Sequence, residues 1–207
     1  MAILTCQQIK KRIYDTSDPL RRLVVTPLLE PESQLDKGSS SLDIRLGTHF
    51  LQQRRTDIGI IEPGRAKSKP EVAVSVVRSV KPFGGVFILH PNQFVLGCSL
   101  EYIKMPIDLS AYVVGRSTWG RLGLIVATAI GIHPLFRGII ALELTNLGEL
   151  PIILRPGRTI AQIFFHTVEG SVDSQGVTTQ SLGDSIPQAT YDFLDKELER
   201  IIKMGEE

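Results

Sequence analysis

The sequence predicts a mainly β protein, folded as a sandwich or barrel of short strands. From about residue 72 to residue 165, runs rich in β-branched and aromatic residues are separated by turns of Gly, Pro and Asn. No long run with a helical period occurs in that region. A chain of 207 residues is long enough for one domain with a substantial core and short for two. Together these observations favour a single β-sandwich or β-barrel domain.

A short helix is expected before the β region and an amphipathic helix after it. Thr5 and Gln8 form a capping-box pattern that precedes apolar residues at helical spacing, so we expect a helix over about residues 5–14. Residues 171–187 are typical of a linker. The last segment places apolar residues on one helical face, namely Tyr191, Leu194, Leu198, Ile201 and Ile202. We therefore expect a β domain over residues 1–170, and a linker with a C-terminal helix over residues 171–207.

The first predicted strand is in SSSLDIRLG, residues 39–47, where apolar and charged residues alternate. The alternating residues are Leu42, Asp43, Ile44, Arg45 and Leu46. This period of two is typical of a strand with one buried face. The polar segment 54–71 that follows is rich in turn-forming residues and is expected to be a surface loop.

Composition restricts the partners and the compartment. The net charge of +1 gives no overall field, so neither duplex nucleic acid nor an acidic membrane surface is an expected partner. The two cysteines, Cys6 and Cys98, are far apart and in no paired motif, which fits a reducing compartment. The N-terminus lacks the pattern of a secretory signal, and no apolar run is long enough to span a bilayer. We expect a cytoplasmic protein.

Motifs of two common nucleotide-handling sites are missing from the sequence. Zinc nucleobase deaminases require H-x-E and P-C-x-x-C elements, and neither occurs. The four histidines are scattered and form no close pair. Lone histidines on strands are more often structural, which is the interpretation favoured for His49, His90 and His166. No P-loop and no G-x-G-x-x-G between a strand and a helix is present. Because both zinc-binding elements are missing, we expect no zinc in this protein.

The segment GRSTWGRLGL, residues 115–124, gathers two guanidinium groups and two hydroxyls between glycines. Arg116, Ser117, Thr118 and Arg121 carry the donors, and backbone N–H groups near glycines add to them. Such a set can bind phosphate without a P-loop. The alternative is structural: the arginines form surface salt bridges and Ser117 caps a turn. Composition alone does not separate the two interpretations.

Glu143 lies in GIIALELTN, an otherwise apolar run. A carboxylate is seldom buried without a partner, and burial raises a carboxyl pKa whereas a paired arginine lowers it. One interpretation is a general base tuned by its surroundings. The other is an edge strand on which Glu143 faces solvent.

Several motifs in series resemble those of the dCTP deaminase branch of the trimeric dUTPase superfamily. The resemblance extends from the N-terminal helix to about residue 165, with the motifs in the expected order. SSSLDIRLG resembles the family's first motif, and the long central block ends in GRST where the family has Gly-Arg-Ser-Ser. FRGIIALELTN resembles the strand with the catalytic glutamate, and PIILRPGRTIAQIFF resembles the closing motif.

This resemblance implies a dUTPase-like β fold and a homotrimer whose active sites are shared between subunits. It also implies a deaminase that acts without zinc on a nucleoside triphosphate bound with Mg²⁺. Glu143 matches the general base that helps to activate water for attack on C4 of cytosine. Ser117 matches the hydroxyl that helps to orient that water, and Arg121 matches the arginine near the substrate.

The resemblance also implies residues that contact the rest of the substrate. Arg116 and Thr118, the latter in place of the motif's second serine, are assigned to phosphate. Ala129 matches a residue whose backbone lines the base pocket. Gln162 matches a glutamine of the closing motif, with either a substrate-binding or a purely structural role.

The chain departs from the family pattern after the predicted base pocket. The family has Ile-Asp-Pro-Gly where this sequence has Ile-His-Pro-Leu, so that His133 replaces the acidic residue and Leu135 replaces the glycine. The family Asp handles the hydrolytic water in dUTPases and helps to position the sugar in deaminases, so its loss argues against a dUTPase-type mechanism. The C-terminal segment also lacks the family's pattern for closing over the triphosphate, and a helix is expected there instead.

Three functions remain in view from the sequence. The leading one is a dCTP deaminase that releases dUTP and ammonia. The second is a relative that acts on another nucleotide, and the third is a nucleotide-binding or regulatory homologue without catalysis.

Overall fold

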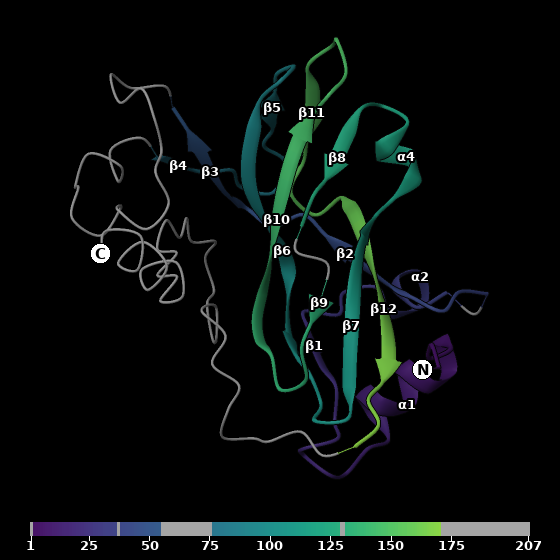
Figure 1. Cartoon of the computed structure of the whole chain (residues 1–207). Helices are drawn as coiled ribbons and strands as arrows, with labels where there is room; N and C mark the ends of the chain where they lie inside the picture. Colours follow the sequence, from purple (N-terminus) through teal and green to yellow (C-terminus); the bar gives the residue numbers. More distant parts are fainter. Residues whose placement is uncertain (1, 37, 55–75, 129–130, 171–207) are drawn as a thin grey trace, which may run out of the picture.

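The computed structural model describes residues 2–36, 38–54, 76–128 and 131–170. Within these residues the chain is mainly β, as the sequence predicts (Figure 1). The helices are α1 Cys6–Tyr14, α2 Pro31–Gln34 and α4 Ser117–Gly120. The strands are β1 Val24–Thr26, β2 Leu42–Arg45, β3 His49–Gln53, β4 Val76–Val80, β5 Phe87–Leu89, β6 Phe94–Lys104, β7 Leu109–Gly115, β8 Leu124–Val126, β9 Gly131–Ile132, β10 Arg137–Asn146, β11 Ile152–Leu154 and β12 Thr159–Thr167.

Helix α1 begins where the capping box predicts. The Thr5 hydroxyl accepts a hydrogen bond from the backbone N–H of Gln8, and the Gln8 side chain accepts one from the backbone N–H of Thr5. Ile9 and Ile13 are buried on the face that packs against the β domain. The predicted helix over residues 5–14 is confirmed. The expected C-terminal helix lies outside the described residues.

The described strands form two main sheets and a two-stranded ribbon. The large sheet has the order β4-β3-β6-β10-β8, with β1 also paired to β6. The smaller sheet has the order β2-β12-β7-β9, and the ribbon pairs β5 with β11. All of these pairings are antiparallel. The strand predicted in residues 39–47 is confirmed as β2, which lies at the edge of the smaller sheet.

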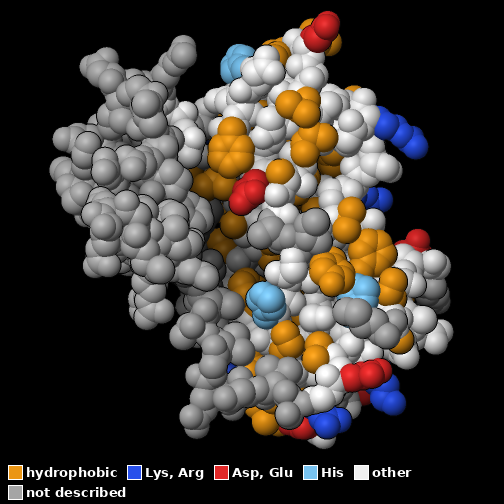
Figure 2. Space-filling model, in the orientation of Figure 1, with side chains coloured by type: hydrophobic (Ala, Val, Ile, Leu, Met, Phe, Trp, Pro, Cys, Tyr) orange, Lys and Arg blue, Asp and Glu red, His pale blue; other side chains and the backbone are white. Residues whose placement is uncertain are grey.

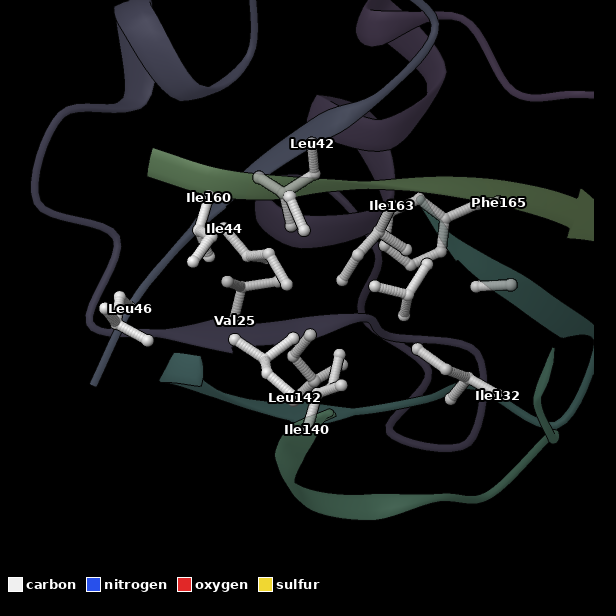
Figure 3. Packing of buried hydrophobic residues seen from close by; sticks show 14 of the residues in the cluster. Val25, Leu42, Ile44, Leu46, Ile132, Ile140, Leu142, Ile160, Ile163 and Phe165 are labelled. Carbon is white, nitrogen blue, oxygen red and sulfur yellow. The ribbon is translucent and has the colours of Figure 1, made fainter. Parts of the chain in front are cut away.

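The core lies between the two main sheets. Figure 3 shows Leu42, Ile44 and Ile163 of the smaller sheet facing Val25 and Leu142 of the large sheet. These side chains come from alternate positions of their strands, as a two-layer β fold requires. The alternation therefore fixes which residues of each strand point outward and are available to a site.

The outer surface of this β domain is apolar in places. Figure 2 shows one face with many hydrophobic side chains and few charged ones. Tyr112 and Val114 of β7 and Ile125 of β8 are among the exposed large hydrophobic residues. No helix among the described residues is both long enough and apolar enough to cross a membrane.

Candidate functional site

The predicted site residues 116–121 lie in the connection between β7 and β8. Strand β7 ends at Gly115, where a Cβ atom would come within 3.1 Å of the Val126 side chain of β8. Short helix α4 follows, and the backbone N–H of Arg121 donates to the Ser117 carbonyl at 3.0 Å. The tight turn leaves the side chains of Ser117, Thr118 and Arg121 exposed.

Arg116 is held at the start of this turn by an ion pair. Its Nη1 donates to Oδ2 of Asp43 in β2, and both side chains are partly buried. Burial raises the pKa of Asp43, and the Arg116 guanidinium lowers it by a smaller amount. The salt-bridge interpretation is thus correct for Arg116. Within the described residues, Arg121 forms no ion pair, and Ser117 makes no capping hydrogen bond.

Two hollows meet at Arg116. The larger, with a volume of about 790 Å³, contains Arg45, Arg155 and Arg158, and we call it the arginine pocket. The smaller, of about 380 Å³, contains Asp43 and is called the Asp43 pocket. Arg116 lines both, so its guanidinium can bind an anion in one hollow while its position is fixed by the carboxylate in the other.

The other two residues assigned to substrate contacts in this region are divided between these hollows. Thr118 lines the arginine pocket. Gln162 lies opposite Asp43 in the β12–β2 register and lines the Asp43 pocket. The structure therefore brings Gln162 beside Asp43 and Arg116, but places Thr118 on the other side of Arg116.

Glu143 is half-buried on the outer face of β10. Its neighbours Leu142 and Leu144 point into the core, whereas Glu143 shares the opposite face with Ala141 and Thr145. β10 lies between β6 and β8, so the expectation of an edge strand is wrong. The backbone N–H of Glu143 donates to the Thr128 hydroxyl at 3.2 Å, and its side chain has no ion-pair partner among the described residues. Neither of the two hollows includes Glu143.

His133 begins an exposed turn whose backbone explains a feature of the sequence. The N–H of Phe136 donates to the His133 carbonyl at 3.3 Å, and Leu135 has a φ of 65°. Proline at the second position and a positive φ at the third are typical of a type II turn, which favours glycine at the third position. Leu135 therefore occupies the turn position that favours glycine, two residues after His133.

A buried polar network beside the site was not identified from the sequence. Glu101 of β6 is fully buried, and its carboxylate accepts hydrogen bonds from the Gln34 amide and the Arg45 backbone N–H, both at 2.9 Å. The Arg45 guanidinium in turn donates to Oε1 of Gln34 at 2.8 Å. Burial raises the pKa of Glu101, and the hydrogen bond from the Arg45 backbone lowers it by a smaller amount. The sequence feature that indicates this network is the position of Glu101, which alternation places on the inward face of its strand.

Two further points concern the predicted base pocket and a possible metal site. Ala129 lies outside the described residues. Among the residues that the structure does describe, no three His, Cys, Asp or Glu side chains lie together in a group that could hold a metal ion.

Comparison with known proteins identifies a family. Residues 3–168 match the family model described as dCTP deaminase-like. The chain is 40% identical over 196 residues to a dCTP deaminase of Haloarcula marismortui, covering 89% of this chain and 97% of that protein. It is also 40% identical over 172 residues to a Halobacterium salinarum protein named dCTP deaminase, dUMP-forming, covering 83% of each.

A solved structure shares the fold. The chain superposes on 2'-deoxycytidine 5'-triphosphate deaminase from Agrobacterium tumefaciens with a TM-score of 0.58 and 21% sequence identity. The match covers 79% of this chain and 46% of that one.

Proposed function

Because the chain belongs to the dCTP deaminase-like family, we propose that it converts dCTP and water to dUTP and ammonia. The observation that carries the proposal is the availability of the three candidate catalytic side chains. Ser117 and Arg121 are exposed, Glu143 is half-exposed, and none of their side chains has a hydrogen-bond or ion-pair partner among the described residues. They are therefore free to contact a substrate.

In the proposed reaction, Glu143 takes a proton from the attacking water. The oxygen bonds to C4 of cytosine, and Glu143 passes its proton to N3 of the ring. Glu143 then moves the remaining proton of the new C4 hydroxyl to the amino group, so that the C4–N bond breaks, ammonia leaves and C4 becomes the carbonyl of uracil. Ser117 orients the water, and Arg121 stabilises charge that develops on the ring. Ala129 and His133 are proposed to contact the base and the sugar. No zinc takes part.

The phosphates are proposed to lie near Arg116, with Thr118 and Gln162 as further donors. Mg²⁺ would enter with the triphosphate, since this ion is usually held by substrate phosphates, waters and one or two carboxylates. Asp36 and Asp43 line the Asp43 pocket and supply carboxylates beside Arg116.

We also propose that the active unit is a homotrimer with shared sites. Its support is that Glu143 lines neither hollow around Arg116, together with the exposed apolar residues Tyr112, Val114 and Ile125. Light scattering at micromolar concentration should give three times the mass of the chain. A monomer that is nevertheless active would contradict shared sites.

The activity is tested by incubating the protein with dCTP, or separately with dUTP, and Mg²⁺ while ammonia and pyrophosphate are measured. Glu143→Gln should abolish ammonia release from dCTP, whereas Glu149→Gln, the same change at an exposed turn position, should not. No ammonia from wild-type protein would refute the deaminase proposal.

The name of the Halobacterium salinarum relative raises a second candidate, a deaminase that continues to dUMP. That activity would release pyrophosphate as well as ammonia. We expect none, because His133 stands where the resemblance places the acidic residue that handles the hydrolytic water in dUTPases.

A further inference from the structure

The arginine pocket is a strongly cationic hollow that includes residues with no role in the proposed chemistry. Arg45 comes from β2, Arg155 and Arg158 come from the turn between β11 and β12, and Arg116 comes from the start of α4. Glu30 supplies the one carboxylate among the lining residues. A cluster of this kind attracts anions, because guanidinium groups pair with phosphate or carboxylate oxygens through two parallel hydrogen bonds.

Two of the four arginines in this pocket have no acidic partner among the described residues. Arg116 has Asp43 as its partner, but Arg155 and Arg158 are exposed and form no ion pair among the described residues. The Arg45 guanidinium donates its hydrogen bond to the neutral Gln34 side chain, and the buried Glu101 carboxylate lies near it. At least three guanidinium groups therefore have donors available to a ligand.

Arg45 is the most informative of these residues because it is 7% exposed. Burying a charged side chain is costly unless its donors are satisfied. Within the described residues, Asp108 Oδ1 is the only buried side-chain nitrogen or oxygen that lacks a hydrogen-bond partner. The guanidinium donors of Arg45 that do not bind Gln34 must therefore reach open space, and the arginine pocket is the hollow that Arg45 lines.

The buried network fixes the direction of the Arg45 guanidinium. The Gln34 amide nitrogen donates to Glu101 at 2.9 Å and to the Asp43 carbonyl at 3.1 Å. Both amide hydrogens are thereby used, so Oε1 of Gln34 is left facing Arg45. The arginine is held in place before any ligand arrives, which lowers the entropy cost of binding.

The rest of the pocket wall is apolar and partly aromatic. Trp119, Phe83 and Ile153 contribute to it. The Trp119 Nε1–H donates to the Thr159 carbonyl at 2.8 Å, which holds the indole beside the arginines. A planar group can pack against such a surface while its anionic part binds the guanidinium groups.

We infer that Arg45, Arg155 and Arg158 form a phosphate-binding site for a nucleotide. Ser117 and Arg121 lie on the same turn as Arg116 but do not line this hollow, so it is separate from the place where cytosine is proposed to react. The phosphate belongs either to the substrate itself or to a second nucleotide that acts as an effector. The chemistry of recognition is the same in both cases.

Trp119 provides a direct assay because it is the single tryptophan of the chain. Inorganic triphosphate, titrated without Mg²⁺, should change the Trp119 emission in a saturable way. The double variant Arg155→Gln/Arg158→Gln should raise the Kd by about tenfold or more, as expected for loss of charge-assisted hydrogen bonds. Arg78→Gln/Arg137→Gln removes the same charge from exposed positions outside the pocket and should leave the Kd near that of wild type. Circular dichroism confirms that each variant is folded.

The inference is overturned if wild-type protein shows no saturable change, or if the two double variants bind triphosphate equally. Glu143→Gln should bind triphosphate like wild type. The KM for dCTP then distinguishes the substrate's own phosphates from those of a second nucleotide. This step rests on the proposed function. A raised KM in the Arg155→Gln/Arg158→Gln variant assigns the pocket to the substrate's own phosphates, and an unchanged KM assigns it to a second nucleotide. Triphosphate binding without any deamination would refute the proposed function and leave this site intact.

Discussion

Replacing Asn146 with alanine should destabilise the protein substantially, because this fully buried side chain connects three segments. Its amide nitrogen donates to the carbonyls of Leu89 in β5 and Leu150 before β11, at 3.0 and 2.9 Å. Its amide oxygen accepts from the backbone N–H of Gly148 at 2.9 Å. Asn146 thus ties the end of β10 to the β5–β11 ribbon that forms part of the arginine pocket.

The magnitude follows from these three hydrogen bonds. Each contributes about 1 kcal/mol net, and a buried group left unpaired costs about 1–3 kcal/mol. We expect Asn146→Ala to lower the free energy of unfolding by about 3 kcal/mol, within the range for a broken buried network. For a chain of this size that corresponds to a fall in Tm of about 6–12 °C.

Urea unfolding followed by circular dichroism, at one fixed protein concentration, measures this loss. The midpoint should fall while the slope with urea stays constant. Thr145→Ala, on the outer face of the same strand, should cost less than about 1 kcal/mol and serves as the control. A loss below about 1 kcal/mol for Asn146→Ala, at unchanged slope, would refute the reasoning, because water would then be replacing the amide.

Two further predictions concern other buried positions. Burial raises the pKa of Glu101 above the ordinary 4.5, so the folded state holds this proton more tightly than the unfolded state; stability should therefore rise as pH falls from the raised pKa toward 4.5. Glu101→Gln should flatten that part of a stability-against-pH profile, and an unaltered profile would assign the effect to other groups. At Gly47, a Cβ would lie 2.6 Å from Cys98 Sγ and 2.9 Å from the Ser99 carbonyl, so Gly47→Ala should cost about 1–3 kcal/mol in urea unfolding. Gly120→Ala, where the added atom meets open space, should change stability by less than about 0.5 kcal/mol, and equal losses in both variants would contradict the steric explanation.

The parts of the fold that depend on local pattern were predictable from the sequence. The capping box predicts the start of α1. The alternation of Leu42, Asp43 and Ile44 predicts β2 and which of its faces is buried. Both signals lie within a few residues of one another, where propensity and periodicity are informative.

The polar contacts around the site were not predictable, because their partners are far apart in the chain. Arg116 meets Asp43 across 73 residues, and Glu101 meets Gln34 across 67. The alternation of residues in β6 indicates that Glu101 points inward. It does not indicate which groups donate hydrogen bonds to the Glu101 carboxylate. The arginine pocket has the same origin, since β2 and the turn before β12 come together only through strand pairing.

The position of Glu143 relates the proposed assembly to the proposed chemistry. In one chain this carboxylate is half-exposed on the outer face of β10, away from both hollows at Arg116. If Glu143 acts on a substrate whose phosphates lie near Arg116, the two parts of a shared site must come from different chains. Association through the exposed apolar surface near Ile125 would remove water from that face of β10, since β8 and β10 are paired. The specific activity of the deaminase should therefore fall on dilution below the assembly concentration, more steeply than the amount of protein does. A specific activity that is constant across that range would place the complete site within one subunit.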